Sequence, residues 1–226
     1  MFVDYVACGD CLELMKEMPN KCIDVSFTSP PYNTLRDWRH TKYLEAEIDS
    51  KDWLEQQCDV IDELLRVTKK YVLINVQCLH GNRSNVYKLI GHYSDRIHDI
   101  VIWYKHNARP CGTPNKISNG YEMLLILKCK GVHKVDVNSG FMRNVFETNS
   151  KTKNPYSKIH KAVMNREFCD FVISEFTKEG DIVLDPYLGL GTTALSCIEH
   201  NRHYVGFELN ETYFNIAQQR INEANK

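Results

Sequence analysis

The chain has 226 residues, 43% of them hydrophobic, and a formal net charge of −1. A chain of this length can bury a full hydrophobic core, so we expect one domain over residues 1–226. No apolar run approaches the roughly 18 residues of a membrane span, and the first residues lack a basic signal region. These features argue against a membrane protein and favour a cytoplasmic one.

The nine cysteines are odd in number and scattered through apolar segments, which is typical of reduced, buried thiols and not of a disulfide framework. Cys8 and Cys11 have the spacing of a zinc ligand pair, but no second Cys-x-x-Cys completes a set of four. We therefore predict no metal site.

Strand-like and helix-like runs alternate along the chain, which predicts an α/β fold with a mostly parallel sheet and helices on both faces. The expected strands cover residues 5–8, 22–28, 71–76, 97–104, 121–127, 181–184 and 204–207. The expected helices cover residues 11–18, 50–67, 83–91 and 191–197, and two more begin after Asn165 and Asn210.

Three stretches depart from this alternation. A loop rich in Pro, Gly and Asn joins the expected strands 97–104 and 121–127, which predicts an antiparallel hairpin at the edge of the sheet. Residues 130–158 are mostly polar and are expected to be irregular. Residues 33–49 show no periodicity, and we expect a long loop there.

Positive charge is concentrated in one quarter of the chain. Residues 105–161 contain eleven Lys or Arg but three Asp or Glu, a net charge of +8. Aromatic residues are interspersed among these bases: Tyr121, Phe141, Phe146 and Tyr156. A run of charged residues is usually a solvated surface. Lys and Arg side chains mixed with aromatic ones, however, favour a surface that faces nucleic-acid phosphates.

The most informative local signal is Thr-Ser-Pro-Pro-Tyr at residues 28–32, where an expected strand ends. Two adjacent prolines stiffen the backbone and donate no N–H, so the Pro30 carbonyl stays available. That carbonyl and the Ser29 hydroxyl can accept both N–H bonds of a planar amine, while Tyr32 offers a face for stacking. An ordinary structural turn can have the same sequence. The five residues alone therefore do not distinguish an amine-binding turn from a structural one.

Residues 183–193 read Val-Leu-Asp-Pro-Tyr-Leu-Gly-Leu-Gly-Thr-Thr, a strand end followed by a glycine loop and a helix start. Gly189 and Gly191 allow the backbone to bend and to approach a ligand closely. The loop lacks the Lys-Ser/Thr of a phosphate-binding P-loop. Glu208 ends the next expected strand. A carboxylate at this position can accept hydrogen bonds from both hydroxyls of a ribose. These features predict a cofactor that carries a ribose.

The chain resembles the DNA amino-methyltransferases that use S-adenosylmethionine, and the resemblance covers nearly all of it. The segments that carry it are the cofactor loop at 183–193 and residues 9–14, 23–33, 102–105, 121–122, 144–146 and 160–165. The family usually has His-Pro where this chain has His160-Lys161. The catalytic turn precedes the cofactor loop, an order typical of the family's permuted β group.

The resemblance implies a Rossmann-like methyltransferase fold with a mostly parallel, seven-stranded sheet. It divides the chain into a catalytic half (1–105), a DNA-facing basic segment (about 106–161) and a cofactor-loop half (162–226). It also implies double-stranded DNA as the partner, from which the target base is flipped out of the duplex. Whether the protein forms a homodimer or accompanies a cognate restriction endonuclease stays open at this point.

Site residues follow from the resemblance, motif by motif. Ser29, Pro30, Pro31 and Tyr32 would hold the target amine. The residues implied to bind S-adenosylmethionine are Asp10, Asn33, His160, Asp185, Tyr187, Gly189, Gly191, Thr192 and Glu208. The residues expected to contact DNA are Arg36, Trp38, Arg39, Lys105, Arg109, Lys116, Lys151, Lys153 and Lys158.

The target base depends on Ser29, because the cytosine-N4 members of the family resemble this chain there, whereas adenine-N6 members more often carry Asp. The predicted activity is methyl transfer to cytosine N4, with adenine N6 as the alternative. An RNA methyltransferase and a non-catalytic nucleic-acid-binding relative are further alternatives. Intact glycine-loop and Pro-Pro motifs argue against the non-catalytic one.

Overall fold

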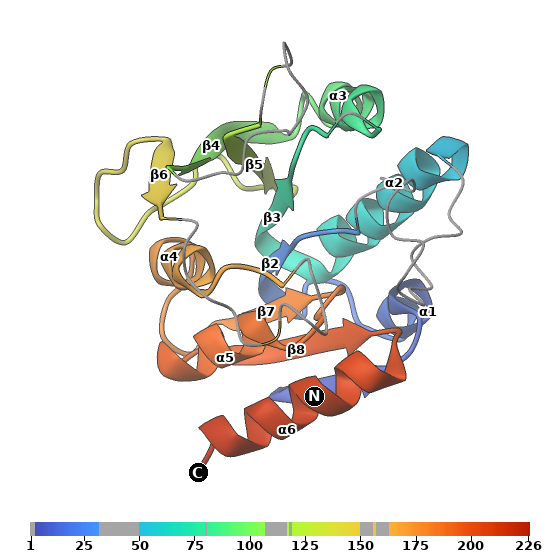
Figure 1. Cartoon of the computed structure of the whole chain (residues 1–226), viewed down its shortest axis with the longest axis vertical. Coiled ribbons are helices and arrows are strands. Elements are labelled where there is room, and N and C mark those ends of the chain that lie inside the picture. The colour runs from blue at the N-terminus through green and yellow to red at the C-terminus, as the bar shows by residue number, and fades with distance from the viewer. Residues whose placement is uncertain are drawn as a thin grey trace.

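The computed structural model describes residues 3–31, 50–79, 81–106, 117, 119–149, 156 and 163–226 (Figure 1). Its strands are β1 (Tyr5–Cys8), β2 (Ile23–Thr28), β3 (Thr68–Val76), β4 (Ile97–Lys105), β5 (Tyr121–Lys128), β6 (Val145–Thr148), β7 (Ile182–Asp185) and β8 (His203–Glu208). Its helices are α1 (Cys11–Lys16), α2 (Ser50–Val67), α3 (Arg83–His92), α4 (Arg166–Phe176), α5 (Thr192–Glu199) and α6 (Glu211–Ala224). The predicted alternation of strands and helices is therefore confirmed.

The strands form one mixed sheet in the order β1-β8-β7-β2-β3-β5-β4-β6. Neighbouring strands are parallel except where β5 runs antiparallel to β3 and to β4. The sheet has eight strands, so the expectation of seven was wrong. The predicted hairpin of β4 and β5 is antiparallel, but it does not form the edge, because β6 pairs with β4 on its outer side.

The eighth strand, β6, lies in the stretch that its polar composition predicted to be irregular. Its four residues pair with β4 alone, from Ile102↔Val145 to Lys105↔Thr148. Long-range contacts hold it in place: the Trp103 indole donates to the Thr148 hydroxyl at 2.8 Å, and the Phe146 ring stacks on Phe171 of α4. Non-local pairing of this kind leaves no periodic signal in so short a segment.

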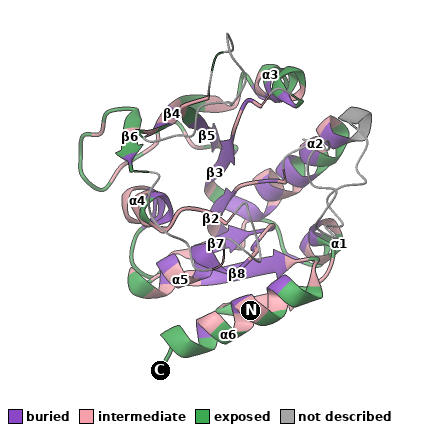
Figure 2. Ribbon diagram, viewed as in Figure 1, coloured by how far each residue is buried: buried purple, intermediate pink, exposed green. Residues whose placement is uncertain are grey.

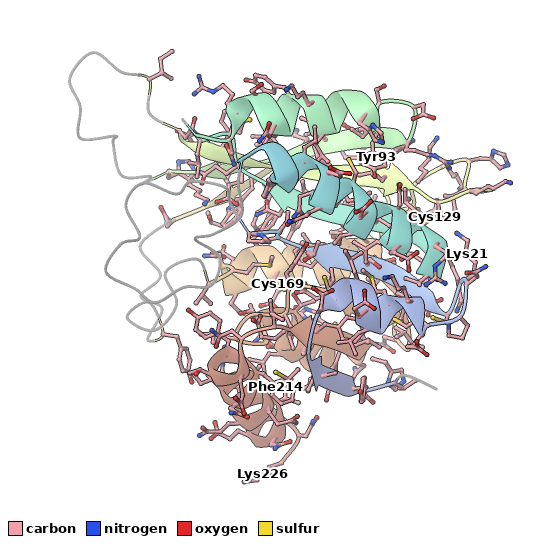
Figure 3. The ribbon with its side chains drawn as sticks, turned by 90° about the vertical axis from the view of Figure 1, so that its right-hand side faces the viewer. Lys21, Tyr93, Cys129, Cys169, Phe214 and Lys226 are labelled. Atoms are coloured by element: carbon pink, nitrogen blue, oxygen red, sulfur yellow. The ribbon has the colours of Figure 1, made fainter. Side chains whose placement is uncertain are left out.

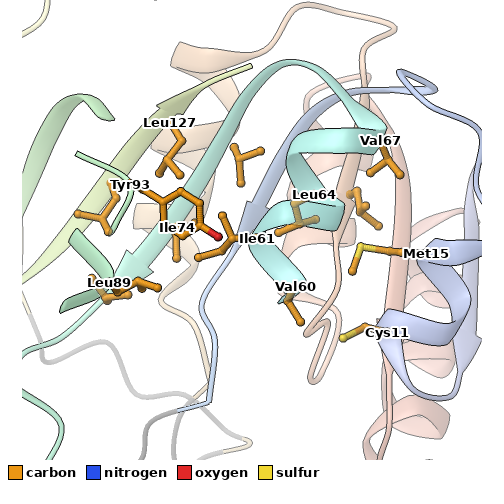
Figure 4. Packing of buried hydrophobic residues seen from close by; sticks show 14 of the residues in the cluster. Cys11, Met15, Val60, Ile61, Leu64, Val67, Ile74, Leu89, Tyr93 and Leu127 are labelled. Atoms are coloured by element: carbon orange, nitrogen blue, oxygen red, sulfur yellow. The ribbon is translucent and has the colours of Figure 1, made fainter. Parts of the chain in front are cut away.

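Helices cover both faces of the sheet, as predicted. One face packs against α1, α2 and α3 around Met15, Leu64 and Ile74, whose packing Figure 4 shows from close by. The other face packs against α4, α5 and α6 around Phe168 and Phe27. Figure 2 shows the buried residues concentrated in the central strands and on the helix faces turned toward them. Two apolar layers of this kind supply most of the stabilisation of an α/β domain.

The inward face of α2 agrees in part with the sequence. From the apolar spacing we expected a stripe of Leu54, Cys58, Ile61, Leu64 and Leu65; Ile61 and Leu64 are buried, and the other three are partly exposed. Trp53 and Gln57, which lie outside that stripe, are also buried. The difference matters because Trp53 and Gln57 both reach the site described below.

The amino edge of the parallel strands is closed by backbone and side-chain contacts, and Figure 3 shows Lys21 and Cys129 on that side of the molecule. The Lys21 ammonium donates to the carbonyls of Leu65 and Thr68, at 3.2 and 2.6 Å. The opposite, carboxyl edge is where ligands bind in folds of this class.

None of the described helices is long and apolar enough to cross a membrane. Across the same described ranges, no group of three or more His, Cys, Asp or Glu side chains is placed to hold a metal ion.

Candidate active site

The carboxyl edge of the sheet brings the Pro-Pro turn beside the glycine loop. Strand β2 ends at Thr28 and lies next to β7, which ends at Asp185, and β7 lies next to β8, which ends at Glu208. Residues 157 positions apart in the sequence, Thr28 and Asp185, therefore meet within three neighbouring strands. The resulting site contains Ser29, Pro30 and Pro31 from one segment and Tyr187, Gly189, Gly191 and Thr192 from another.

Asp185 joins the two segments through its buried carboxylate, which is 3% exposed. One oxygen accepts from the Thr28 hydroxyl at 2.7 Å and from the Tyr187 N–H at 3.1 Å, and the other accepts from the Thr193 hydroxyl at 2.6 Å. Burial raises the pKa of this carboxyl, and the three hydrogen bonds oppose that shift. Asp185 thus fixes the last residue of β2 against the loop and the start of α5.

The Pro-Pro turn is also held from α2, by a residue that the sequence did not single out. The Trp53 indole, 2% exposed, donates to the Pro31 carbonyl at 2.8 Å. Pro30 is buried and Ser29 is partly exposed. Because the two prolines donate no N–H, an outside donor is the means by which this turn is anchored.

The glycine loop bends through two left-handed residues, Gly189 (φ 55°) and Gly191 (φ 80°). Glycine adopts this region without the steric cost that a Cβ brings. The Leu188 N–H donates to the Phe207 carbonyl at 2.8 Å, and Arg220 of α6 donates to the Leu190 carbonyl. The loop is therefore pinned to β8 and α6, and the N-terminus of α5 follows directly.

Glu208 lies at the loop with its carboxylate held by two backbone N–H groups. One oxygen accepts from Gly189 and the other from Asn210, each at 2.8 Å. A carboxylate oxygen can accept more than one hydrogen bond, so ribose hydroxyls fit as further donors. Asp10 follows β1, which pairs with β8, and caps α1 by accepting from the N–H groups of Leu12 and Glu13 at 2.8 and 3.3 Å.

The Tyr187 hydroxyl points to α1 and α2. The Gln57 amide lies 3.3 Å from it through Nε2 and 3.5 Å through Oε1. Burial raises the pKa of the nearby Cys11 thiol to about 12. Burial likewise raises the pKa of Tyr187, so both groups are neutral at physiological pH.

A polar cluster lies at the same edge of the sheet, beyond β2. The Lys105 ammonium pairs with the buried Glu122 carboxylate and lies 4.1 Å from the centre of the Trp103 ring. The Asn75 amide donates to Glu122 at 2.5 Å, and its Oδ1 has no hydrogen-bond partner within the described part of the chain. Lys105, expected to contact DNA, therefore already has a buried counter-charge.

A family model described as DNA methylase, of the N6/N4 type, matches residues 23–219 of the chain. The chain belongs to this DNA methylase family. It is thus a DNA methyltransferase.

Individual relatives agree with this assignment. The chain is 26% identical to the Type II methyltransferase M.Cfr9I of Citrobacter freundii over 94% of its own length and 86% of that protein. It is 25% identical to the Type II methyltransferase M.HinfI of Haemophilus influenzae over 98% of its own length and 69% of that protein.

Solved structures share the fold. The PvuII DNA methyltransferase (cytosine-N4-specific) superimposes with a TM-score of 0.75 at 15% identity, covering 97% of this chain and 90% of the other. The M1.HpyAVI–SAM complex superimposes with a TM-score of 0.66 at 21% identity, covering 96% of this chain and 98% of the other.

Several residues that the sequence predicted for the methylase site lie outside the residues that the structure describes. They are Tyr32, Asn33, Arg36, Trp38, Arg39, Arg109, Lys116, Lys151, Lys153, Lys158 and His160. The described members of the predicted set lie at the carboxyl edge of the sheet, where Lys105, at the end of β4, is separated from the others by β3 and β5. Trp53 and Gln57 were missed, and Thr28 was identified as part of the 28–32 motif but not as a partner of Asp185. The signal that could have found the first two is their spacing of four residues, which places them on one face of a helix.

The left-handed backbone of the glycine loop gives a first testable prediction. Gly191→Ala is expected to lower the free energy of unfolding of the methylase by about 2 kcal/mol, since αL costs L-residues about 1–2 kcal/mol. The added Cβ would also lie 3.2 Å from that of Ala217. Gly131→Ala is the control, because Gly131 has φ 89° but open space around it. Urea denaturation should show a larger loss at Gly191. Equal losses would mean that packing against α6 does not constrain the loop.

Proposed function

We propose that this DNA methyltransferase moves a methyl group from S-adenosylmethionine to the exocyclic N4 amine of cytosine in double-stranded DNA, with the base flipped out. The observation that carries the proposal is the hydrogen bond between Thr28 and Asp185. It joins the Ser29-Pro30-Pro31 turn, which can accept an amine, to the glycine loop and Glu208, which can hold a nucleoside.

The residues present fit the cofactor. Glu208 would accept the ribose hydroxyls beside Gly189. Asp10, at the adjacent strand end, would border the adenine, while Asp185, Gly191 and Thr192 would border the methionine part. When bound, S-adenosylmethionine supplies a methyl group that leaves a sulfonium sulfur for the target nitrogen, with the electron pair staying on sulfur.

The chain's own contribution is the orientation of the target amine. The lone pair of that nitrogen is delocalised into the base ring. Acceptance of its two N–H bonds by the Ser29 hydroxyl and the Pro30 carbonyl would turn the lone pair toward the methyl group. This is catalysis by positioning and by preorganised dipoles. The proton leaves after transfer, when the nitrogen is positive and acidic, so no strong general base is needed.

Ser29 supports cytosine as the target, and the position of the turn before the cofactor loop supports membership of the permuted β group. We further propose that residues 1–105 form the catalytic half, that about 106–161 face DNA, and that 162–226 form the cofactor-loop half. The +8 charge of residues 105–161 supports the DNA-facing role.

Mass analysis of nucleosides tests the assignment. Mixed-sequence genomic DNA is incubated with the protein and S-adenosylmethionine, then digested to nucleosides. We expect N4-methylcytosine to appear with the wild type. N6-methyladenine without N4-methylcytosine would reject the cytosine assignment but keep the enzyme class. Methylation of RNA but not of DNA would reject DNA as the substrate.

A further inference from the structure

We propose that Trp53 and Gln57 are positioning residues for methyl transfer, because they close a ring of contacts that fixes the Pro-Pro turn against the cofactor loop. This inference rests on the proposed function. Both side chains come from α2, and both are 2% exposed. A spacing of four residues places them on the same face of the helix.

The ring can be followed from residue to residue. Thr28 donates to Asp185, which accepts from the N–H of Tyr187. The Tyr187 hydroxyl contacts the Gln57 amide. Trp53 lies one helical turn before Gln57 on α2 and donates to the Pro31 carbonyl. Pro31 follows Thr28 by three residues, which closes the ring through the backbone. Every member of the ring is thus tied to a neighbour on each side by a contact or by the backbone.

The turn is held to the loop by two sets of contacts. Asp185 accepts directly from Thr28, and α2 connects Pro31 to Tyr187 through Trp53 and Gln57. A single hydrogen bond at Thr28 would leave the turn able to pivot about the end of β2. The second tie, at Pro31, removes that freedom. Because a displacement of about 1 Å can cost about 100-fold in rate, a tie of this kind acts on catalysis and not only on stability.

Trp53 also distinguishes the two proline carbonyls. Its indole N–H occupies the carbonyl of Pro31. The carbonyl of Pro30, one residue earlier, is the one that the proposed function assigns to the target amine. Trp53 therefore holds the turn in the orientation in which Pro30, and not Pro31, would serve as acceptor.

The test compares Trp53→Phe with Tyr93→Phe. Trp53→Phe keeps a ring in the core but removes the N–H donor to the turn. Tyr93→Phe also removes one buried donor to α2, at the Cys58 carbonyl (3.0 Å) and the Asp62 carboxylate (2.9 Å), neither of which belongs to the ring. We expect kcat to fall about 10- to 100-fold for Trp53→Phe, with the Kd for S-adenosylmethionine changed less than threefold. Tyr93→Phe should lower the melting temperature and leave kcat unchanged.

A second readout does not depend on turnover. Hydrogen–deuterium exchange of the backbone at residues 185–191 should become faster in Trp53→Phe and stay unchanged in Tyr93→Phe. Gln57→Leu removes the contact between α2 and Tyr187. It should likewise lower kcat and speed exchange at residues 185–191, so it tests the inference even if Trp53→Phe does not fold.

The outcomes separate the inference from the proposed function. Equal kcat and equal exchange in the Trp53 and Tyr93 variants would overturn the positioning role while leaving the methyltransferase assignment intact. A wild type with no methyl transfer to any nucleic acid would overturn the proposed function, and with it the catalytic role of the ring. The exchange experiment would then still decide whether α2 couples the turn to the loop.

Discussion

Replacement of Asp185 by alanine is expected to reduce methyl transfer at least about 100-fold, because the turn and the loop lose their direct tie. The free energy of unfolding should fall by at least about 3 kcal/mol, since three buried donors lose their acceptor and each costs about 1–3 kcal/mol. The donors affected are the hydroxyls of Thr28 and Thr193 and the N–H of Tyr187. Single-turnover kinetics and urea denaturation measure the two effects on the same preparation.

Asp181→Ala is the matched control, because Asp181 directly precedes β7, at the end opposite Asp185. Its carboxylate pairs with Lys70 at 2.6 and 2.7 Å and accepts from the Lys178 N–H at 2.9 Å. Its loss should destabilise the protein but leave the rate unchanged in the folded fraction. If the two variants were equally active under conditions where both are folded, the tie between turn and loop would have no catalytic role.

The raised pKa of Asp185 adds a pH dependence of defined sign. Burial raises the pKa of this carboxyl above its unfolded value, about 3.9 for Asp. The folded state then binds the proton more tightly, so this group's contribution to stability is complete below about pH 4 and is lost as the pH rises through the folded pKa. Asp185→Asn cannot titrate. The advantage in stability of the wild type over this variant should therefore shrink as the pH rises from about 4.

Local signals predicted most of the helices and strands correctly, with β6 as the exception. Asn165 and Asn210 were predicted to cap helices, and the side chain of each accepts the N–H three residues on, at Phe168 and Tyr213. The glycine loop was identified because a short segment carries its geometry: Gly189 and Gly191 have the positive φ that the bend requires. Caps and tight turns depend on a few neighbouring residues, which is why one sequence is enough to predict them.

Contacts between distant segments could not be predicted in the same way. Thr28 and Asp185 are 157 positions apart, and the local sequence around either residue does not indicate that the other is its partner. Strand β6 forms because Phe146 and Thr148 meet partners on α4 and β4. Trp53 was missed because the predicted stripe on α2 did not include it, although Ile61 and Leu64 of that stripe are buried as expected. An apolar stripe indicates which helix face is buried, but it does not show which of its neighbours reach a site on another element.

Exchange of Glu208 for glutamine is expected to raise the Kd for S-adenosylmethionine about 10- to 100-fold, since hydrogen bonds to a charged group contribute about 1.5–3 kcal/mol. The carboxylate accepts from the N–H groups of Gly189 and Asn210 on its two oxygens. A glutamine keeps one acceptor oxygen, so its NH2 group must face one of these donors. The substitution would therefore disturb the loop and also the ribose contact that we propose, and isothermal titration calorimetry measures the loss of affinity directly.

Glu211→Gln is the control for charge alone. Glu211 is exposed in the first turn of α6, three residues from Glu208, and its change removes the same negative charge from the same end of the sheet. It should alter the Kd less than threefold, because the effect of an exposed charge on a helix dipole is a few tenths of a kcal/mol to about 1 kcal/mol. Equal changes in the two variants would show that Glu208 acts through its charge and not by accepting the ribose hydroxyls. A large change confined to Glu208 would show that the acceptor geometry at the end of β8 holds the nucleoside.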